Sequence, residues 1–496
     1  MARVFSKFPE ALPRRDLLIL AATVLVGAVI YLLASQLTYR IGFPLDDSWI
    51  HQTYARNLAE RGEWAYRPGL SSAGSTAPLW SALLALGFLL KLGPYIWTYL
   101  LGAVTLWLLA IVGESTLRTL IPAYRPRLPW VGLFLVFEWH LLWAAMSGME
   151  TLFHALVVTT VLAALMTGSR RYLTLGLLTG LSVWVRPDGL TLIGPVVMTI
   201  LLVEKDTPSR LRALLRYFIG LGSLLFLYLL FNLMIGGTPM PNTFYAKQAE
   251  YAAWQSLPIL GRLGQLSLQL LVGPSVFLLP GVIAWIGLSV RRRAWGMLAA
   301  IIWFFGYLWL YVSRLPVYQH GRYIMPAMPI FFLMGLLALV DFVQSKQFGR
   351  YHWFVQTIWQ ASVLFTSLAF IAMGANSYAQ DVAVIESEMV TSARWAARNI
   401  PPDAVIAAHD IGALGYFDDH KLVDLAGLIS PEVIPFIRDE KKLAVFLNEQ
   451  QADYLIAFPD FYPQLVKEAQ PVFTSGGDFA PRFGEDNMTI YRWKRP

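Results

Sequence analysis

Two adjacent carboxylates, Asp46 and Asp47, follow the first long apolar run of the chain. The apolar spacing after them predicts a helix over residues 48–61, which Asp47 or Ser48 would cap. A carboxylate held beside an apolar wall can have its pKa raised toward neutrality, which suits a general base. The simpler interpretation is a helix cap followed by a solvated acid. The neighbouring His51 favours a site, because ionisable groups near a membrane are costly and tend to be functional.

The same stretch contains groups that bind metals. Asp46, Asp47 and His51 together have the donor types that a divalent cation accepts. No closed ligand motif such as HExxH occurs, so the sequence does not demand a metal. The chain also contains no P-loop, no GxGxxG fingerprint and no GxSxG elbow, which argues against a nucleotide-binding enzyme or a serine hydrolase.

Further polar residues stand at the ends of later apolar runs, where we expect outer loops. They are Glu150, Arg186, Asp188, Asn242, Tyr245, Lys247, His320, Arg322 and Tyr323. The four cations among them predict a site for a lipid phosphate or pyrophosphate, since such groups bind phosphate by charge-assisted hydrogen bonds. The others, with His51 and Tyr54, are expected to contact the rest of the substrate. Taken singly, each also has a structural explanation, such as a helix-dipole acid, a local ion pair or a snorkelling cation.

The elements that must hold these side chains are mostly membrane helices. The 496 residues are 56% hydrophobic and 14% charged, whereas a soluble chain carries about 25% charged residues. Uncharged runs close to twenty residues long recur, which predicts a polytopic membrane protein and excludes a soluble enzyme, a disordered chain and a coiled coil. The absence of cysteine excludes disulfides, thiolate metal sites and cysteine nucleophiles.

We expect about eleven transmembrane helices. The first covers residues 17–37 and is interpreted as a retained anchor, because its apolar run is too long for a cleaved signal peptide. The others are expected at residues 79–113, 129–146, 150–168, 172–185, 190–203, 217–235, 264–288, 295–313, 324–343 and 353–374. The run 79–113 must cross the membrane once, so it either bends at Pro94 or is partly re-entrant.

Basic residues mark the loops that we expect in the cytoplasm. They are Arg3, Lys7, Arg14, Arg15, Arg118, Arg125, Arg127, Arg170, Arg171, the segment 205–216, Arg291, Arg292, Arg293, Lys346 and Arg350. The positive-inside rule then places the N-terminus in the cytoplasm, and the long loop 39–78 and the C-terminal part outside. Residues 1–374 carry 28 Lys and Arg against 14 Asp and Glu. Topology explains this basic excess, and no nucleic-acid partner is expected.

Residues 375–496 have a different character, with 18 Asp and Glu against 11 Lys and Arg. An amphipathic helix is expected over residues 384–399, and short strands are expected at residues 405–408, 421–428, 454–458 and 488–493. We therefore divide the chain into a transmembrane domain, residues 1–374, and a small extracytoplasmic α/β domain, residues 375–496.

The motifs, taken in order, resemble those of the C-type membrane glycosyltransferases (GT-C), in which an acidic pair follows the first span. More narrowly, they are similar to segments of bacterial enzymes of the terminal β-(1→2)-arabinofuranosyltransferase type. The segments are DDSWIHQTYARNLAERG, GSTAPLW, GMETLF, RPDG, PNTFYAK, HGRY with MPAMP, and AHDIGALGYFDDHKLVDLAGL. GSTAPLW stands where many relatives have a Glu-Gly-Tyr-Thr type stretch, which puts the acceptor contacts in question.

The resemblance implies a GT-C fold in the inner (plasma) membrane and an inverting, extracytoplasmic transfer of a hexose or pentose. The donor would be a polyprenyl-phosphate sugar and the acceptor a cell-envelope glycan or glycolipid. Asp46, or else Asp47, would be the general base, and the four cations would stabilise the leaving phosphate. Asp410 and Asp424 are expected to matter little to the chemistry. The alternative is a transporter or flippase of a lipid-linked sugar, which would use the same cations without a base.

Overall fold

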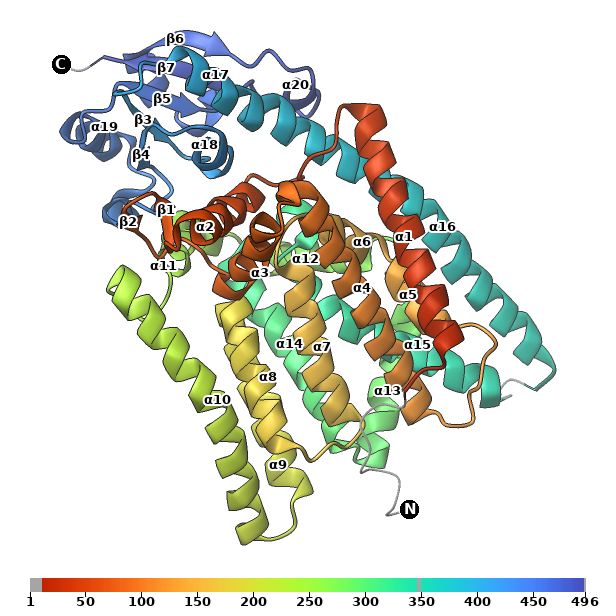
Figure 1. The fold of residues 1–496 in the computed structure, drawn as a ribbon. Helices are drawn as coiled ribbons and strands as arrows, with labels where there is room; N and C mark the ends of the chain where they lie inside the picture. The colour runs from red at the N-terminus through yellow and green to blue at the C-terminus, as the bar shows by residue number, and fades with distance from the viewer. Residues whose placement is uncertain (1–10, 346–348, 495–496) are drawn as a thin grey trace.

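The computed structural model describes residues 11–345 and 349–494, which form a helical bundle with a small α/β sheet at one end (Figure 1). Within these residues, seven helices are long and apolar enough to cross a membrane. They are α1 (Arg14–Thr38), α4 (Gly93–Leu120), α10 (Thr207–Gly236), α13 (Ser275–Arg292), α14 (Trp295–Arg314), α15 (Met328–Ser345) and α16 (His352–Ile385).

Shorter apolar helices complete the bundle. They are α5 (Trp130–Phe137), α6 (Trp139–Met146), α7 (Thr151–Met166), α8 (Tyr172–Val185), α9 (Ile193–Val203) and α12 (Ile259–Leu271). The predicted polytopic helical architecture is confirmed; seven of the predicted runs contain long spans, and the remaining runs form shorter helices.

The run 79–113 is not a single helix that bends at Pro94. It forms two helices, α3 (Pro78–Leu89) and α4, joined by a tight turn in which Lys91 and Gly93 have positive φ angles of 57° and 69°. Pro94 lies in the first turn of α4, where a missing N–H costs nothing, so it starts a helix and does not bend one.

The segments between α1 and α3 and after α10 form a layer between the bundle and the sheet. Its elements are α2 (Asp47–Arg61), β1 (Ala65–Arg67), β2 (Leu70–Ser71) and α11 (Asn242–Glu250). The helix predicted over 48–61 is present and ends at Gly62, whose left-handed φ of 70° closes the last turn. The predicted cap is wrong: the N-cap residue is Asp46, and its side chain does not hydrogen-bond to α2.

Helix α16 continues without a break through residues 386–390 into α17 (Thr391–Asn399). The expected helix over 384–399 is therefore the end of one 48-residue helix that begins at the far side of the bundle. In Figure 1 it runs diagonally from that side up to the sheet, so a single continuous helix connects the membrane part to the C-terminal part.

The C-terminal residues form a five-stranded sheet in the order β4-β3-β5-β7-β6. Its strands are β3 (Val405–Ala408), β4 (Lys421–Asp424), β5 (Tyr454–Ala457), β6 (Ala469–Thr474) and β7 (Thr489–Trp493), and its helices are α18 (Gly412–Phe417), α19 (Glu440–Glu449) and α20 (Phe479–Arg482). Strands β4, β3 and β5 are parallel, whereas β7 is antiparallel to both of its neighbours, β5 and β6. The predicted α/β character is confirmed; β6 was not predicted.

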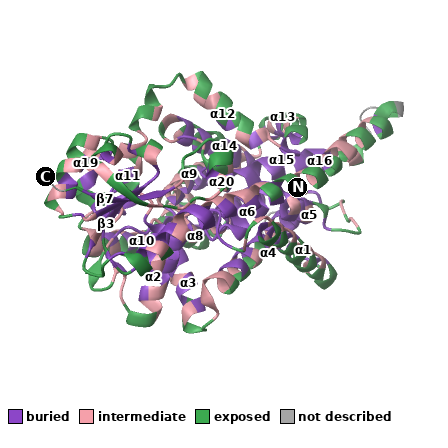
Figure 2. Cartoon of the chain, turned by 90° about the horizontal axis from the view of Figure 1, so that it is seen from above, coloured by how far each residue is buried: buried purple, intermediate pink, exposed green. Residues whose placement is uncertain are grey.

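The burial pattern is that of a bundle in lipid. Helix α15 is buried along most of its length, whereas α1, α10 and α16 turn large apolar side chains outward (Figure 2). Leu25, Phe226 and Phe365 are between 65% and 70% exposed. Water would penalise such a continuous apolar surface, so these faces are expected to contact acyl chains.

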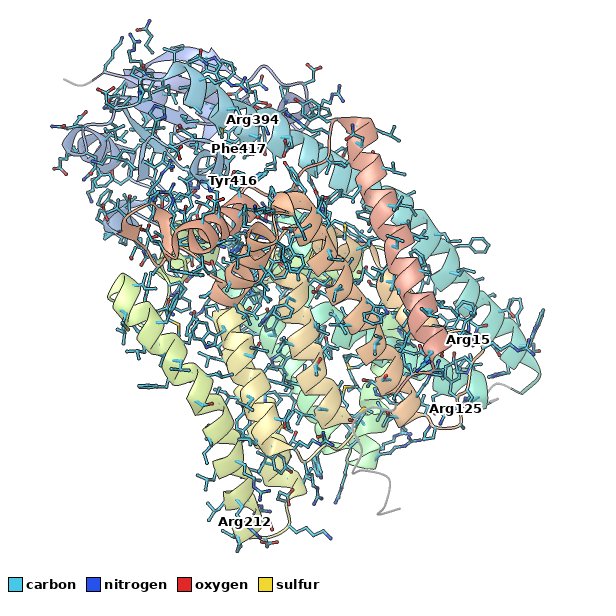
Figure 3. All side chains as sticks on the ribbon, in the orientation of Figure 1. Arg15, Arg125, Arg212, Arg394, Tyr416 and Phe417 are labelled. Carbon is cyan, nitrogen blue, oxygen red and sulfur yellow. The ribbon has the colours of Figure 1, made fainter. Side chains whose placement is uncertain are left out.

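Basic side chains gather at the end of the bundle away from the sheet. Figure 3 labels Arg15, Arg125 and Arg212 at that end. This arrangement agrees with the loops that the charge pattern singled out. Four residues of that prediction, Arg3, Lys7, Lys346 and the side chain of Arg350, lie outside the described residues.

Candidate active site

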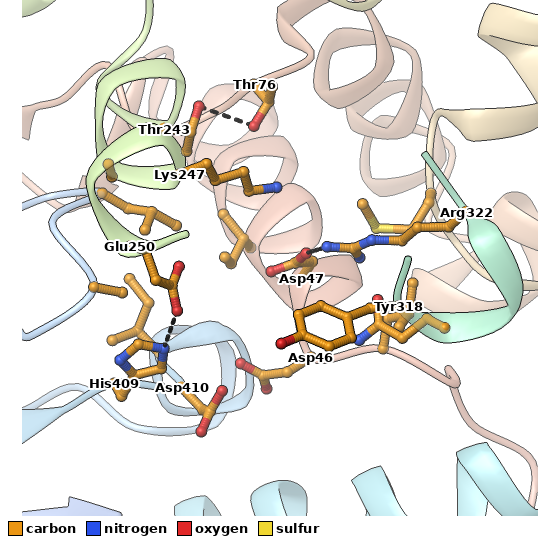
Figure 4. Close-up of a pocket in the computed structure, with 18 of the residues that line it drawn as sticks. Asp46, Asp47, Thr76, Thr243, Lys247, Glu250, Tyr318, Arg322, His409 and Asp410 are labelled. Carbon is orange, nitrogen blue, oxygen red and sulfur yellow. Dashed lines mark hydrogen bonds and ion pairs between the residues drawn. The ribbon is translucent and has the colours of Figure 1, made fainter. Parts of the chain in front are cut away.

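A cavity of about 550 Å³ lies where the bundle meets the C-terminal sheet (Figure 4). Its walls come from stretches far apart in sequence: the start of α2, helix α11, the segment 318–323 before α15, and the loop 409–411 after β3. The volume lies within the range of small-molecule sites. Both aspartates that the sequence singled out, Asp46 and Asp47, line this cavity.

Asp46 is held by the C-terminal part of the chain. The backbone N–H groups of Gly412 and Ala413, at the start of α18, donate to its two carboxylate oxygens at 2.7 and 2.8 Å. Each oxygen keeps a further lone pair, so the carboxylate can still accept a hydroxyl group. Burial, and then the negative charge of Asp410, raise the pKa of Asp46 to about 7.

Gly412 makes this contact possible. A Cβ at this position would overlap the backbone oxygen of Asp46 and would lie 2.7 Å from its carboxylate. Only a residue without a side chain therefore lets α18 approach Asp46 this closely. Other contacts support the same junction: the Arg56 guanidinium donates to the Tyr416 backbone oxygen at 2.8 Å, and the guanidinium of Arg394 lies 4.6 Å from the Phe417 ring (Figure 3).

Asp47 is held from the opposite side, by the membrane part. Its Oδ2 lies 2.7 Å from Nη2 of Arg322, while 35% of its side chain remains exposed. Burial acts to raise the pKa of Asp47, but the charges of Arg322 and Lys247 outweigh it and lower the pKa below its ordinary value. The two neighbouring aspartates therefore differ in proton affinity, because each has a different partner.

Arg322 retains unused hydrogen-bonding capacity. Its guanidinium is buried, and Nε and Nη1 have no hydrogen-bond partner among the described residues. Nη2 also donates to the Tyr323 hydroxyl at 3.1 Å. A buried guanidinium with two unused donors is costly unless an acceptor arrives, and a phosphate suits its planar geometry.

Lys247 belongs to the same end of the cavity. It projects from α11 into the space beside Asp47 and Arg322 (Figure 4). Its ammonium lies 5.3 Å from the centre of the Tyr323 ring, and the Arg322 guanidinium lies 5.0 Å from that centre. Two cations thus share one aromatic ring, which concentrates positive charge near Asp47.

Arg186 also lines the cavity, but carboxylates already surround it. Its guanidinium lies 2.8 Å from Glu150 and 3.2 Å from Asp188. Asp188 in turn accepts hydrogen bonds from Tyr307 and Tyr311. Arg186 and Glu150 are therefore brought to the site as an internally neutralised group. Asp188 lies behind it, outside the lining of the main cavity.

His51 lines the cavity without joining the aspartates as a metal ligand. Its Nε2 lies 3.3 Å from Glu150, and its Nδ1 is hydrogen-bonded to Ser81 at 2.9 Å. Across the described residues, no group of three or more His, Cys, Asp or Glu side chains is arranged to hold a metal ion. His51, on α2, instead connects Glu150 to Ser81 of α3.

Besides Asp188, three more predicted substrate contacts lie outside the cavity lining. Tyr54 is fully buried; its hydroxyl is 2.6 Å from Ser72 Oγ and accepts a hydrogen bond from the Gly74 N–H. The Asn242 amide donates to the Leu428 backbone oxygen at 2.9 Å, which ties α11 to the C-terminal part. Tyr245 is half-buried and does not face the cavity. Tyr323, in contrast, lines it.

His320 is separated from the other three predicted phosphate ligands. Its Nε2 lies 2.8 Å from Asp381 of α16, and its ring packs against Trp139 and Trp143. Gln319 and His320 have positive φ angles of 49° and 58°, and this turn carries His320 away while Arg322 enters the cavity.

A second cavity, of about 290 Å³, adjoins the first. Both are lined by Thr76, Arg186, Thr243, Lys247 and Tyr323. The rest of the second cavity is mainly apolar, with side chains from the short helix Pro187–Leu192 that precedes α9, from α11 and from the end of α14. These include Leu190, Phe244, Leu310 and Leu315. An apolar compartment therefore meets the cationic end of the main cavity.

Comparison with known proteins gives a family match over the C-terminal part. Residues 367–491 match the family described as Domain of unknown function (DUF8728). A search of curated protein sequences gives no match.

Solved structures match over nearly the whole chain. The crystal structures of ArnT from Cupriavidus metallidurans, in the apo state and bound to undecaprenyl phosphate, match at TM-scores of 0.59 and 0.58 and 15% identity, covering 95% of this chain and 97% of ArnT. The cryo-EM structure of the arabinofuranosyltransferase AftD from Mycobacteria matches at 0.51 and 14% identity, covering 98% of this chain but 42% of AftD. The chain has a GT-C-like fold.

The cavity of this GT-C-like fold is also lined by residues that were not expected at the site. His409 was not among the candidates and Asp410 was expected to matter little, yet both line the cavity from the C-terminal part, and Glu250 faces them from α11. A signal existed: residues 409–411 follow a parallel strand, and the carboxyl ends of such strands are frequent ligand sites. Asp424 has a structural task instead, because its carboxylate accepts the N–H groups of Ala426, Leu428 and Ile429.

Proposed function

We propose that this protein is a membrane glycosyltransferase that moves a sugar from a polyprenyl-phosphate donor to a cell-envelope glycan or glycolipid. The observation that carries the proposal is the cavity itself: Asp46 and Asp47 stand between a cationic end and an acidic end, at the outer mouth of a GT-C-like bundle. Transfer from a lipid phosphate needs both a base and a phosphate site, and the cavity contains residues for each.

The cationic end is suited to the donor phosphate. Arg322 offers two nitrogens without a hydrogen-bond partner among the described residues, and Lys247 adds a second positive charge beside it. As the bond to the sugar breaks, negative charge develops on the leaving phosphate, and fixed cations stabilise it. The fold-related ArnT binds undecaprenyl phosphate. In this chain the adjoining apolar cavity would receive the first isoprene units of such a lipid.

Asp46 is the preferred general base. A pKa of about 7 lets it be ionised at neutral pH and still hold an abstracted proton, whereas Asp47, with its lowered pKa, is a weaker base. Asp47 then acts mainly by orienting Arg322. One base with one displacement at the sugar carbon gives inversion, as in inverting glycosidases.

The sugar and the topology are further parts of this proposal. The sequence resemblance and the AftD match favour a pentose such as arabinofuranose over a hexose. Four further crossings would come from shorter helices: α5 and α6 together would form one, and α7, α8 and α9 one each. With the seven long spans they would give eleven crossings of the inner (plasma) membrane. The basic end of the bundle and the N-terminus would face the cytoplasm. Residues 1–374 would form the transmembrane catalytic domain, and residues 375–496 the extracytoplasmic one.

A transfer assay tests the proposal. The purified full-length protein in lipid nanodiscs is given short-chain polyprenyl-phosphate pentoses and hexoses with a cell-envelope glycan extract. Transfer from one donor by the wild type, lost in Asp46→Asn, is the expected result. Saturable binding of the lipid phosphate without transfer from any donor would contradict it and would favour the transporter or flippase alternative.

A further inference from the structure

The end of the cavity formed by the C-terminal domain contains more acids than bases. Its carboxylates are those of Asp46, Glu250, Asp410 and Glu485, and its cations are His409 and Arg438. The two cations do not neutralise these carboxylates equally, because they lie close to only some of them. An incoming substrate therefore meets the carboxylates that have no cation beside them.

Glu250 is already neutralised. One of its carboxylate oxygens lies 3.5 Å from His409 Nε2 and 3.3 Å from Arg438 Nη2. Burial acts to lower the pKa of His409, but the hydrogen bond to Glu250 and the charge of Asp410 raise it to about 9, so the imidazole is cationic at neutral pH. The Nδ1 atom of His409 is hydrogen-bonded to Tyr462 at 2.7 Å, which fixes the ring. These residues form a supporting frame.

Asp410 differs from Glu250. Its carboxylate forms no hydrogen bond or ion pair with any described residue, and it lines the cavity near Asp46 (Figure 4). The nearby positive charge, that of His409, is directed to Glu250. Burial raises the pKa of Asp410 above its ordinary value. In its ionised form, with all its lone pairs free, this carboxylate is a strong acceptor for hydroxyl or ammonium groups, and it repels other anions.

We propose that Asp410 recognises the acceptor, and that it restricts the acceptor to neutral or cationic polyhydroxylated glycans. This inference rests on the proposed function, because it divides the same cavity between a donor phosphate at Arg322 and an acceptor at Asp410. The Asp410 carboxylate binds a hydroxyl beside the one that Asp46 deprotonates. A sugar with a carboxylate or phosphate at that position is repelled by both aspartates, so selectivity arises from exclusion as well as attraction.

The test uses matched acceptors that differ by one charge. Octyl hexosides and pentosides are compared with analogues in which the primary CH₂OH is oxidised to a carboxylate, using the donor that supports transfer. The wild type is expected to use the neutral member at least about tenfold better, since a charge-assisted hydrogen bond typically contributes that much or more. In Asp410→Asn, the KM for the neutral acceptor rises about tenfold and the preference for it shrinks, while the KM for the donor stays unchanged.

Two further variants separate recognition from folding. Asp410→Glu keeps the charge and should retain most of the discrimination. Glu432→Gln removes one exposed charge from the same domain, in a residue that does not line the cavity, and should behave as wild type. An unchanged acceptor KM and unchanged discrimination in Asp410→Asn would overturn the proposal. Equal increases in the donor and acceptor KM would also overturn it, because they indicate a structural role.

A binding measurement distinguishes failure of this inference from failure of the proposed function. Titration of the full-length protein in nanodiscs with the neutral and the oxidised glycoside needs no transfer. If the wild type transfers no sugar but binds the neutral member more tightly, and Asp410→Asn loses that preference, the recognition role stands and the transferase proposal fails. Equal binding of both glycosides by the wild type would overturn the recognition role alone.

Discussion

The two ends of the cavity are built on opposite principles. At the bundle end, a buried guanidinium is paired with Asp47 and keeps two donors unused, so the end is positive and awaits an anion. At the C-terminal end, Glu250 pairs with the nearby cations, and Asp410 has no hydrogen-bond or ion-pair partner among the described residues, so the end is negative. One cavity can thus hold two chemically different substrates in a fixed order.

The adjacent aspartates show how strongly this division acts. Asp46 and Asp47 are neighbours in sequence, yet the pKa of one is raised to about 7 and that of the other is lowered. Asp46 faces the carboxylate of Asp410, whereas Asp47 faces Arg322 and Lys247. Two identical side chains therefore acquire different chemistry from the two ends they touch.

The largest effect should come from removing the base between the two ends. Asp46→Asn is expected to lower the transfer rate by a factor of about 10² to 10⁴, because the amide cannot take the acceptor proton. Single-turnover transfer with saturating donor measures it. Glu60→Gln, at an exposed position on the same helix, is the control and should keep the wild-type rate. A wild-type rate in Asp46→Asn would mean that a residue other than Asp46 is the general base.

Removing the cationic end should have the next largest effect. Arg322→Ala is expected to slow transfer by about 10² to 10³, the usual cost of losing one group that stabilises developing negative charge. Arg322→Lys retains the charge without the planar fork and should fall between that variant and the wild type. Donor and acceptor titrations measure both. If these variants changed only the dependence on acceptor concentration, the cationic end would bind the acceptor and not the donor.

The junction that brings the ends together can be tested through Gly412. In Gly412→Ala the added Cβ overlaps Asp46, so we expect a loss of about 1–3 kcal/mol of stability and a weaker contact between α18 and Asp46. Thermal unfolding in detergent, together with the transfer rate, measures it. Gly222→Ala is the matched control, because a Cβ there meets nothing within 4 Å. Equal behaviour of the two variants would show that the close approach is not needed.

The smallest effect is a shift along the pH axis. A base must be deprotonated, so kcat/KM should rise as the pH rises through about 7 and level off above it. The charges facing Asp46 are those of Asp410 and Asp47, and loss of the first should move the rise to lower pH. The profile of Asp410→Asn against the wild type measures this shift. A rise at the same pH in both proteins would mean that Asp410 does not influence the base.

Some of this arrangement follows from local sequence. Hydropathy is enough to place the long helices, because roughly twenty apolar residues in a row have few other stable states. Strand β6 shows where such reasoning stops: it is a largely exposed edge strand that contains Pro471, so it has neither alternation nor a buried face. Each of the eleven expected runs contains helix, but the turn at residues 90–92, which divides one of them, depends on how α3 packs.

The candidate residues show the same boundary between local and distant information. Arg322 and His320 are two residues apart and were both expected at the phosphate, yet only Arg322 enters the cavity, while His320 pairs with Asp381. The backbone turn between them decides this, and its left-handed angles are not readable from residue types alone. Tyr54 and Asn242 were expected at the substrate, and packing uses both to hold loops.

The sequence by itself determined that this chain is a polytopic membrane protein with an acidic pair at one mouth and a small α/β part at its end. These properties follow from composition and short-range periodicity, which depend on neighbouring residues only. The tertiary structure alone decided that Asp46 meets Gly412 across 366 positions, that Asp47 meets Arg322, and that Asp410 has no partner in the part of the chain that the structure describes. Ion pairs and pKa values depend on distance in space, and the packing of helices and sheet sets that distance.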